Sequence, residues 1–127
     1  MNIELYLPFP PSINNYYVKT SRGQFISAKG KKFRNEVIED IIQQAPNLQI
    51  SGKVLVEMVL FPPDNRRRDM DNYSKAMLDA LTKSGIWEDD VQADQLFTYR
   101  GVSVVGGKTL LRITEAGPVM PEGMFPT

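Results

Sequence analysis

The sequence predicts an α+β fold, or mixed α/β fold, in which two main helices pack on one small mixed sheet of about four strands. Strand-like alternation of apolar and other residues occurs near the start, in the middle and near the end of the chain. Helix-like spacing of apolar residues fills two segments between these strands. The 127 residues suffice for one hydrophobic core and are too few for two ordinary domains. We therefore expect a single domain over residues 1–117, followed by a loosely held Pro/Gly-rich tail over residues 118–127.

The first predicted strand ends at Pro8. Its apolar residues, which alternate with other residues, are Ile3, Leu5 and Leu7. The segment from Pro8 to about Gln24 lacks periodicity and is rich in turn-forming residues. We interpret it as a loop that is long enough to have a function of its own.

Two helices are predicted from their caps and their apolar spacing. The first runs from the N-cap residue Ser27 to a point before Pro46, with apolar residues every four positions. The second opens at Asp71 and ends near Ser84, where Gly85 supplies the left-handed residue that commonly follows a helix.

The remaining strands are predicted from runs of apolar residues. The run over residues 54–61 has two largely apolar faces, as expected for a central strand, and two prolines end it. Two further strands are predicted over residues 96–105 and 109–114, joined through Gly106 and Gly107 as a hairpin.

The composition excludes several kinds of chemistry. The chain has no cysteine and no histidine, which removes disulfides, zinc-thiolate sites and nucleophiles activated by histidine. The formal net charge is zero, but the segment from Val18 to Arg34 contains six basic residues and no acid. No run of 18 apolar residues and no signal-like amino terminus is visible, so we expect a soluble, cytoplasmic protein without a membrane partner.

The candidate catalytic residues surround the second predicted helix. Asp69 and Asp71 lie at the junction of the central strand and this helix, where a turning backbone can direct both into one pocket. Lys75 follows Asp71 by four residues, which places its ammonium group one turn further along the same face. Asp90 lies in a loop that must return toward the helix start. Because carboxylates and water are the ligands that Mg²⁺ and Mn²⁺ prefer, the pattern indicates a divalent-metal site for phosphodiester chemistry.

The same residues allow an ordinary structural interpretation, which spacing alone favours. Asp69 and Asp71 would be N-cap and first-turn acids, Lys75 would pair with Asp71, and residues 88–90 would form a solvated turn.

The candidate contacts to nucleic acid are basic, aromatic and amide residues in three parts of the chain. Arginines next to the candidate site would bind phosphates and add salt-dependent affinity, unless they are a solvated basic run. The tyrosines would stack on unpaired bases, unless they are buried in the core, and the neighbouring asparagines are alternatively turn residues. The full set comprises Arg66, Arg67, Arg68, Asn14, Asn15, Tyr16, Tyr17, Lys29, Lys31 and Lys32.

Four segments carry a resemblance to a known family. They are PFPPSINNYY near the start, SAKGKKFRNEV at the first helix, RRRDMDNYSKAMLDALTKSGIWEDD at the candidate site and ITEAG near the end. Together they resemble the RusA family of Holliday-junction resolvases, over nearly the whole chain to about Gly117. The central segment is the most specific, because its acidic, lysine and GIWEDD elements occur in the family's order.

The resemblance implies a crossover junction endodeoxyribonuclease, phage or prophage encoded, that uses Mg²⁺, or alternatively Mn²⁺, in DNA recombination and repair. The family's three catalytic aspartates fall on Asp69, Asp71 and Asp90, and its essential lysine falls on Lys75. Arg68 matches an arginine that resembles a DNA contact. The implied partners are four-way branched DNA and a second copy of the chain. A two-fold dimer suits this substrate, because it presents two equivalent sites for paired, symmetric cuts.

Two alternative functions stay open at this point. One is a non-catalytic protein that binds branched DNA and whose acids serve as caps and surface charge. The other is a nuclease that acts mainly on flaps or replication forks. The zero net charge is a departure from the resolvases, which tend to be more basic.

Overall fold

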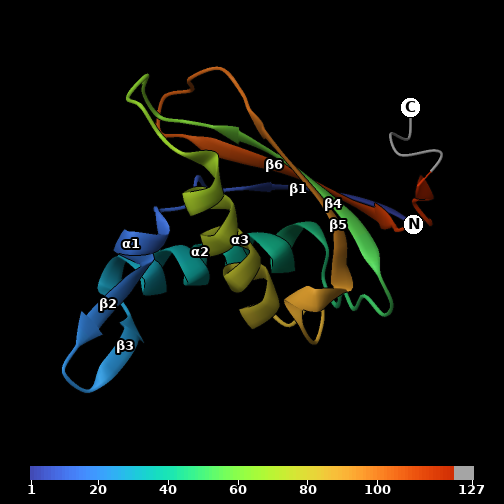
Figure 1. The fold of residues 1–127 in the computed structure, drawn as a ribbon, viewed down its shortest axis with the longest axis horizontal. Helices are drawn as coiled ribbons and strands as arrows, with labels where there is room; N and C mark the ends of the chain where they lie inside the picture. Colours follow the sequence, from blue (N-terminus) through green and yellow to red (C-terminus); the bar gives the residue numbers. More distant parts are fainter. Residues whose placement is uncertain (122–127) are drawn as a thin grey trace.

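The computed structural model describes residues 1–121, which form one four-stranded sheet, a separate two-stranded sheet and helices on one side of the larger sheet (Figure 1). The strand order in the larger sheet is β1-β6-β4-β5. β4 is antiparallel to β6 and parallel to β5, so the sheet is mixed, as predicted. The four strands are β1 (Asn2–Leu7), β4 (Val54–Phe61), β5 (Ala93–Arg100) and β6 (Lys108–Glu115). The prediction that residues 54–61 form a central strand is confirmed, because β4 has a neighbour on each side.

Both predicted helices are present, α2 (Ala28–Gln44) and α3 (Met70–Lys83). The predicted N-cap of α2 is confirmed, because Ser27 Oγ accepts a hydrogen bond of 2.9 Å from the backbone N–H of Gly30. Gly85 follows α3 with φ of +86°, the left-handed conformation expected there. α3 begins at Met70, one residue before the predicted start at Asp71, and Asp69 is its N-cap residue.

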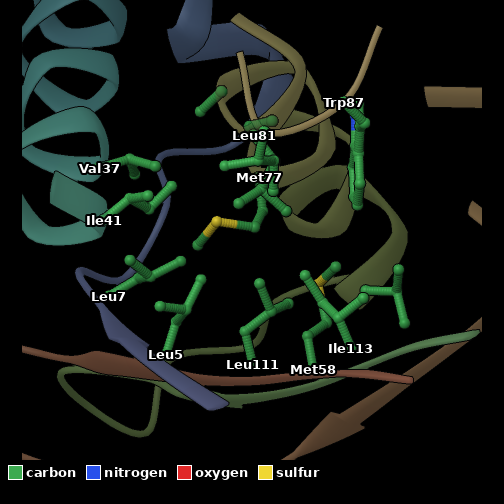
Figure 2. Packing of buried hydrophobic residues seen from close by; sticks show 14 of the residues in the cluster. Leu5, Leu7, Val37, Ile41, Met58, Met77, Leu81, Trp87, Leu111 and Ile113 are labelled. Carbon is green, nitrogen blue, oxygen red and sulfur yellow. The ribbon is translucent and has the colours of Figure 1, made fainter. Parts of the chain in front are cut away.

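The hydrophobic core lies between the sheet and the two long helices (Figure 2). Alternate residues of β1, β4 and β6 point toward the helices and are buried, as the period of a strand requires. In Figure 2, Leu5, Leu111, Met58 and Ile113 rise from the sheet to meet side chains of α2 and α3. The helix residues that meet them are Val37, Ile41, Met77 and Leu81. Burial of each such side chain contributes about 1.5–3 kcal/mol, which fixes α3 over the sheet.

The prediction of a continuous loop from Pro8 to about Gln24 is wrong. This segment contains α1 (Ile13–Tyr16) and a hairpin of β2 (Tyr17–Thr20) and β3 (Gly23–Ile26). Figure 1 shows the hairpin projecting from the body of the molecule. Residues 18–25 are exposed, so the hairpin has no buried face and therefore lacks the apolar alternation that predicts strands.

The predicted hairpin between the last two strands is also wrong. β5 ends at Arg100 and does not pair with β6, because β4 lies between them. The chain after β5 continues along the end of β4, where the N–H of Gly101 donates to the carbonyl of Leu60 at 2.8 Å. It then crosses to the other side of β4, and Gly106 and Gly107 turn it into β6 with φ of +82° and +72°.

Residues 118–121 of the predicted tail are exposed, and its residues 122–127 lie outside the described residues. Within residues 1–121, no helix is both long and apolar enough to span a bilayer.

Candidate active site

The candidate site lies where the carboxyl ends of the two parallel strands meet. β4 ends at Phe61, and residues 64–69 lead from there to the first turn of α3. β5 ends beside it at Arg100, which is the register partner of Leu60. Nη2 of Arg100 donates a hydrogen bond of 2.7 Å to the backbone carbonyl of Arg68, so the strand end and the connecting segment are joined. In sheets with parallel strands, ligand sites commonly form outside this edge.

Asp69 and Asp71 lie at the start of α3, and in the described part of the chain no other protein group pairs with their carboxylates. Asp69 is the N-cap residue, but its side chain accepts no capping hydrogen bond. Asp71 lies in the first turn, and both side chains are exposed. In the part of the chain that the structure describes, neither carboxylate forms an ion pair, with Lys75 or with any other residue. The interpretation of these residues as a capping side chain and an ion-pair partner is therefore not supported, and both are free to bind a cation.

Asp90 opens a short 3₁₀ helix, η1 (Asp90–Gln92), which contacts α3. Asp89 caps η1, because its Oδ1 accepts a hydrogen bond of 3.1 Å from the backbone N–H two residues later. Burial raises the pKa of Asp90, as do a hydrogen bond with Asp89 and the negative charges of Asp89 and Asp79, whereas the positive charge of Lys75 lowers it. Asp90 therefore lies within electrostatic reach of Lys75, which is exposed on α3.

The structure does not gather the three aspartates into one ligand set. Among residues 1–121, no three acidic, histidine or cysteine side chains are placed to hold a metal ion together. Asp69 and Asp71 nevertheless fit Mg²⁺ by their chemistry and exposure. Mg²⁺ is often held by only one or two protein carboxylates, and water and substrate phosphates complete its coordination.

Two of the three predicted phosphate-binding arginines shape the connecting segment. Arg68 is only 8% exposed, its Nη1 lies 2.8 Å from Asp64 Oδ1, and its guanidinium lies 5.7 Å from the centre of the Phe9 ring. Nε of Arg66 lies 3.2 Å from the same oxygen. Hydrogen bonds from the Arg68 side chain and the Arg66 backbone hold the pKa of Asp64 well below its ordinary value. Arg67 is exposed and forms no ion pair within residues 1–121.

An open cleft of about 620 Å³ lies at this edge of the sheet and is lined by Arg67, Arg68, Asp69 and Arg100. Three arginines and one aspartate thus line one space. The sequence did not predict Arg100 as a site residue, because it is an isolated arginine 31 positions after Asp69. Only the parallel pairing of β4 with β5 brings it to the site.

Tyr16 is not placed to stack on a base. Its side chain is fully buried, and its hydroxyl donates a hydrogen bond of 2.5 Å to Asp79 Oδ2. Arg34 completes this group, because its Nη2 lies 3.0 Å from the same oxygen. The prediction that Tyr16 contacts DNA is therefore wrong. The alternative, a buried tyrosine whose hydroxyl is hydrogen-bonded, is confirmed. The network was missed because its members come from three separate helices.

The other predicted contacts near the amino terminus remain predictions. Asn14 and Asn15 are exposed on α1, and Tyr17 is half-buried with its ring edge-on to that of Tyr16 at 4.8 Å. The exposed lysines at the start of α2 are Lys29, Lys31 and Lys32.

Comparison with known proteins identifies the family. The family model described as "Endodeoxyribonuclease RusA" matches residues 8–114. The crossover junction endodeoxyribonuclease rusA of Enterobacteria phage HK97 is 38% identical over 112 residues, which cover 88% of this chain and 93% of the relative. The RusA proteins of Shigella sonnei (strain Ss046) and Escherichia coli (strain K12) are 39% and 38% identical over 111 residues, covering 87% of this chain and 92% of each relative.

These matches place the α+β chain, with its carboxylates and arginines at one edge of the sheet, among the endodeoxyribonucleases. Within that class, it belongs to the RusA family. The matched residues include every candidate catalytic position from Asp69 to Asp90.

Proposed function

We propose that this protein is a Mg²⁺-dependent endodeoxyribonuclease that resolves Holliday junctions by paired, symmetric cuts, in DNA recombination and repair. The observation that carries the proposal is the match to relatives named crossover junction endodeoxyribonucleases over 87–88% of the chain. The exposed, unpaired carboxylates of Asp69 and Asp71 beside a group of arginines support it, because metal-dependent hydrolysis of a phosphodiester uses both a cation site and a phosphate site. Since the substrate is DNA inside a cell, we place the activity in the cytoplasm.

Asp69, Asp71 and Asp90 are the proposed metal ligands, with Mg²⁺ or Mn²⁺ as the ion. When bound there, such an ion would stabilise charge at a phosphate and would lower the pKa of a water molecule. Asp69 and Asp71 present hard oxygen ligands from the start of α3, and the pKa of Asp90 is raised first by burial and then by the neighbouring acids Asp89 and Asp79.

Lys75 is the proposed second catalytic group. It follows Asp71 by one turn on the exposed side of α3 and interacts electrostatically with Asp90. From this position its ammonium group donates hydrogen bonds that orient the attacking water or offset charge that develops on the phosphate oxygens.

We also propose that the active form is a homodimer on a four-way junction. Two symmetric incisions require two equivalent sites, which a two-fold dimer provides. The edge strand β5 supports this proposal, because Phe97 and Tyr99 are 41% and 47% exposed on the sheet face that the helices leave open. Large apolar side chains gathered on an open face are typical of an interface between subunits.

The deciding experiment is cleavage of a labelled four-way junction by the purified protein, in Mg²⁺ and in EDTA. An Asp90→Asn variant and a linear duplex of the same sequence serve as controls. We expect paired, symmetric cuts in the junction alone, which disappear with EDTA and in the variant. Tight junction binding without cutting in any divalent metal would instead favour a non-catalytic binding protein, and preferred cutting of flaps or forks would identify a different branched substrate.

A further inference from the structure

We propose that Arg67 and Arg100 form a phosphate-binding site beside Asp69, in the cleft at the carboxyl ends of β4 and β5. Its ligand is one phosphodiester of the DNA strand that enters the candidate active site. The inference rests on the function proposed above for the identity of the ligand, but the site itself can be tested with inorganic phosphate alone.

The position of Arg100 is the first argument. β4 and β5 are the parallel pair of the larger sheet, and Leu60 and Arg100 are register partners near their carboxyl ends. Beyond this edge the chain continues past the end of β4, where the N–H of Gly101 donates to the Leu60 carbonyl. An open cleft of about 620 Å³ remains at the edge, and Arg100 lines it. That space exceeds what a phosphate group needs, so a phosphodiester with its flanking sugars can enter.

The balance of charge is the second argument. Three arginines line the cleft and Asp69 is the single acidic residue among its lining residues. Arg68 is neutralised by Asp64, whose Oδ1 lies 2.8 Å from its Nη1. Arg67 and Arg100 form no ion pair within the described residues 1–121, so the cleft keeps a surplus of positive charge. A guanidinium group suits an oxyanion, because its planar N–H donors match two phosphate oxygens at once.

The orientation of Arg100 is the third argument. Its Nη2 donates to the carbonyl of Arg68, the residue directly before Asp69, at 2.7 Å. This bond holds the guanidinium against the segment that carries the carboxylates. The side chain forms no other hydrogen bond within residues 1–121, so most of the five N–H donors of an arginine are available to a ligand. Less conformational entropy is lost on binding, because the donor is already placed.

The direct test is a titration of the metal-free protein with inorganic phosphate in EDTA, followed by NMR of the arginine Nε–H signals. We expect the signals of Arg67 and Arg100 to shift and Arg100→Gln to weaken phosphate binding about tenfold or more. Arg112→Gln is the matched control, because Arg112 is an exposed arginine on β6 outside the cleft. Equal affinities for wild type, Arg100→Gln and Arg112→Gln would overturn the proposal.

Two further variants keep the test decisive if Arg100→Gln disturbs the segment it contacts. Arg67→Gln removes an exposed side chain without an ion pair in the described part of the chain, and it should weaken phosphate binding in a folded protein. Asp69→Asn should strengthen phosphate binding in EDTA, because it removes the one negative charge in the cleft. Unchanged affinity in both variants would contradict the site.

The same variants separate this inference from the proposed function. If the wild type cuts junctions but phosphate binding does not depend on Arg67 or Arg100, the phosphate site is wrong and the nuclease stands. If phosphate binds as expected but no junction is cut in any divalent metal, the site stands and the proposed function fails. On junction DNA, Arg100→Gln should raise KM more than it lowers kcat, and Arg100→Lys should restore part of the loss, because it keeps the charge but not the planar pair of donors.

Discussion

The hydroxyl of Tyr16 donates a hydrogen bond of 2.5 Å to Asp79 Oδ2 and so joins α1 to α3 across 63 positions of the chain. Arg34 on α2 contacts both partners, with Nη2 3.0 Å from Asp79 and Nε 3.2 Å from the Tyr16 hydroxyl. Burial, together with the hydrogen bond to Asp79, raises the pKa of Tyr16, so its hydroxyl stays protonated and remains a donor. Asp79 follows Lys75 by one turn of α3, and the network therefore fixes the helix that carries the candidate catalytic groups.

Tyr16→Phe should destabilise the protein without unfolding it. The variant keeps the ring in the core but leaves Asp79 with one partner fewer, which costs about 1–2 kcal/mol of the free energy of unfolding. Urea unfolding followed by circular dichroism measures this difference. Tyr99→Phe is the matched control, because Tyr99 is 47% exposed, and its stability should equal that of the wild type. Equal stabilities of all three proteins would show that the network contributes nothing.

Asp64→Asn should change how stability depends on pH. Hydrogen bonds from Arg68 and from the Arg66 backbone lower the pKa of Asp64 in the folded protein. A lowered pKa stabilises the folded state above the ordinary pKa of aspartate, about 3.9, and this stabilisation is lost as the pH falls below that value. The variant should therefore have a lower Tm than the wild type at pH 7, and the difference should shrink as the pH falls from about 4 toward 2.

The measurement for Asp64 is Tm across this pH range, with Asp94→Asn as the control. Asp94 is exposed on β5 and forms no ion pair in the described part of the chain. Its variant should follow the wild-type curve at every pH. A difference between Asp64→Asn and wild type that stays constant with pH would contradict the role of ionised Asp64.

Local sequence patterns predicted the elements that bury one face. Phe33, Val37 and Ile41 predicted α2, and all three are buried. The β2–β3 hairpin was not predicted because both of its faces are exposed to solvent. Its residues therefore do not alternate between apolar and polar, which is the pattern that predicts a strand. The site divides in the same way. The Asp69–Asp71 pair is local and was predicted, whereas Arg100 depends on pairing between β4 and β5, which no spacing along the chain encodes.

Lys31→Gln should weaken DNA binding through electrostatics alone. Lys31 is exposed in the first turn of α2, within a segment that has no acid between residues 18 and 34. If it contacts a phosphate, its loss should reduce the slope of log K against log salt concentration by about 1, and to a similar extent for junction and duplex. Binding isotherms at several salt concentrations measure the slope. Lys53→Gln is the control, because Lys53 is exposed in the connection after the far end of α2, and an equal effect of both variants would exclude a specific role for the α2 lysines.

Substitution of Lys75 and Asp71 should separate cutting from binding. Lys75→Gln removes the ammonium group beside Asp90 and should lower kcat for junction cleavage by about 10²–10³-fold, the usual loss for one donor that stabilises developing charge. Asp71→Asn should abolish cutting, because it removes a candidate metal ligand. It should leave junction binding intact, because it adds no negative charge that would repel the DNA phosphates. Lys83→Gln, which alters an exposed lysine in the last turn of the same helix, should cut at the wild-type rate. Single-turnover cleavage at saturating protein isolates the cutting step from binding. If Asp71→Asn cuts as fast as the wild type, Asp71 is not a metal ligand, and if Lys75→Gln changes only the affinity for DNA, Lys75 is a phosphate contact and not a catalytic residue.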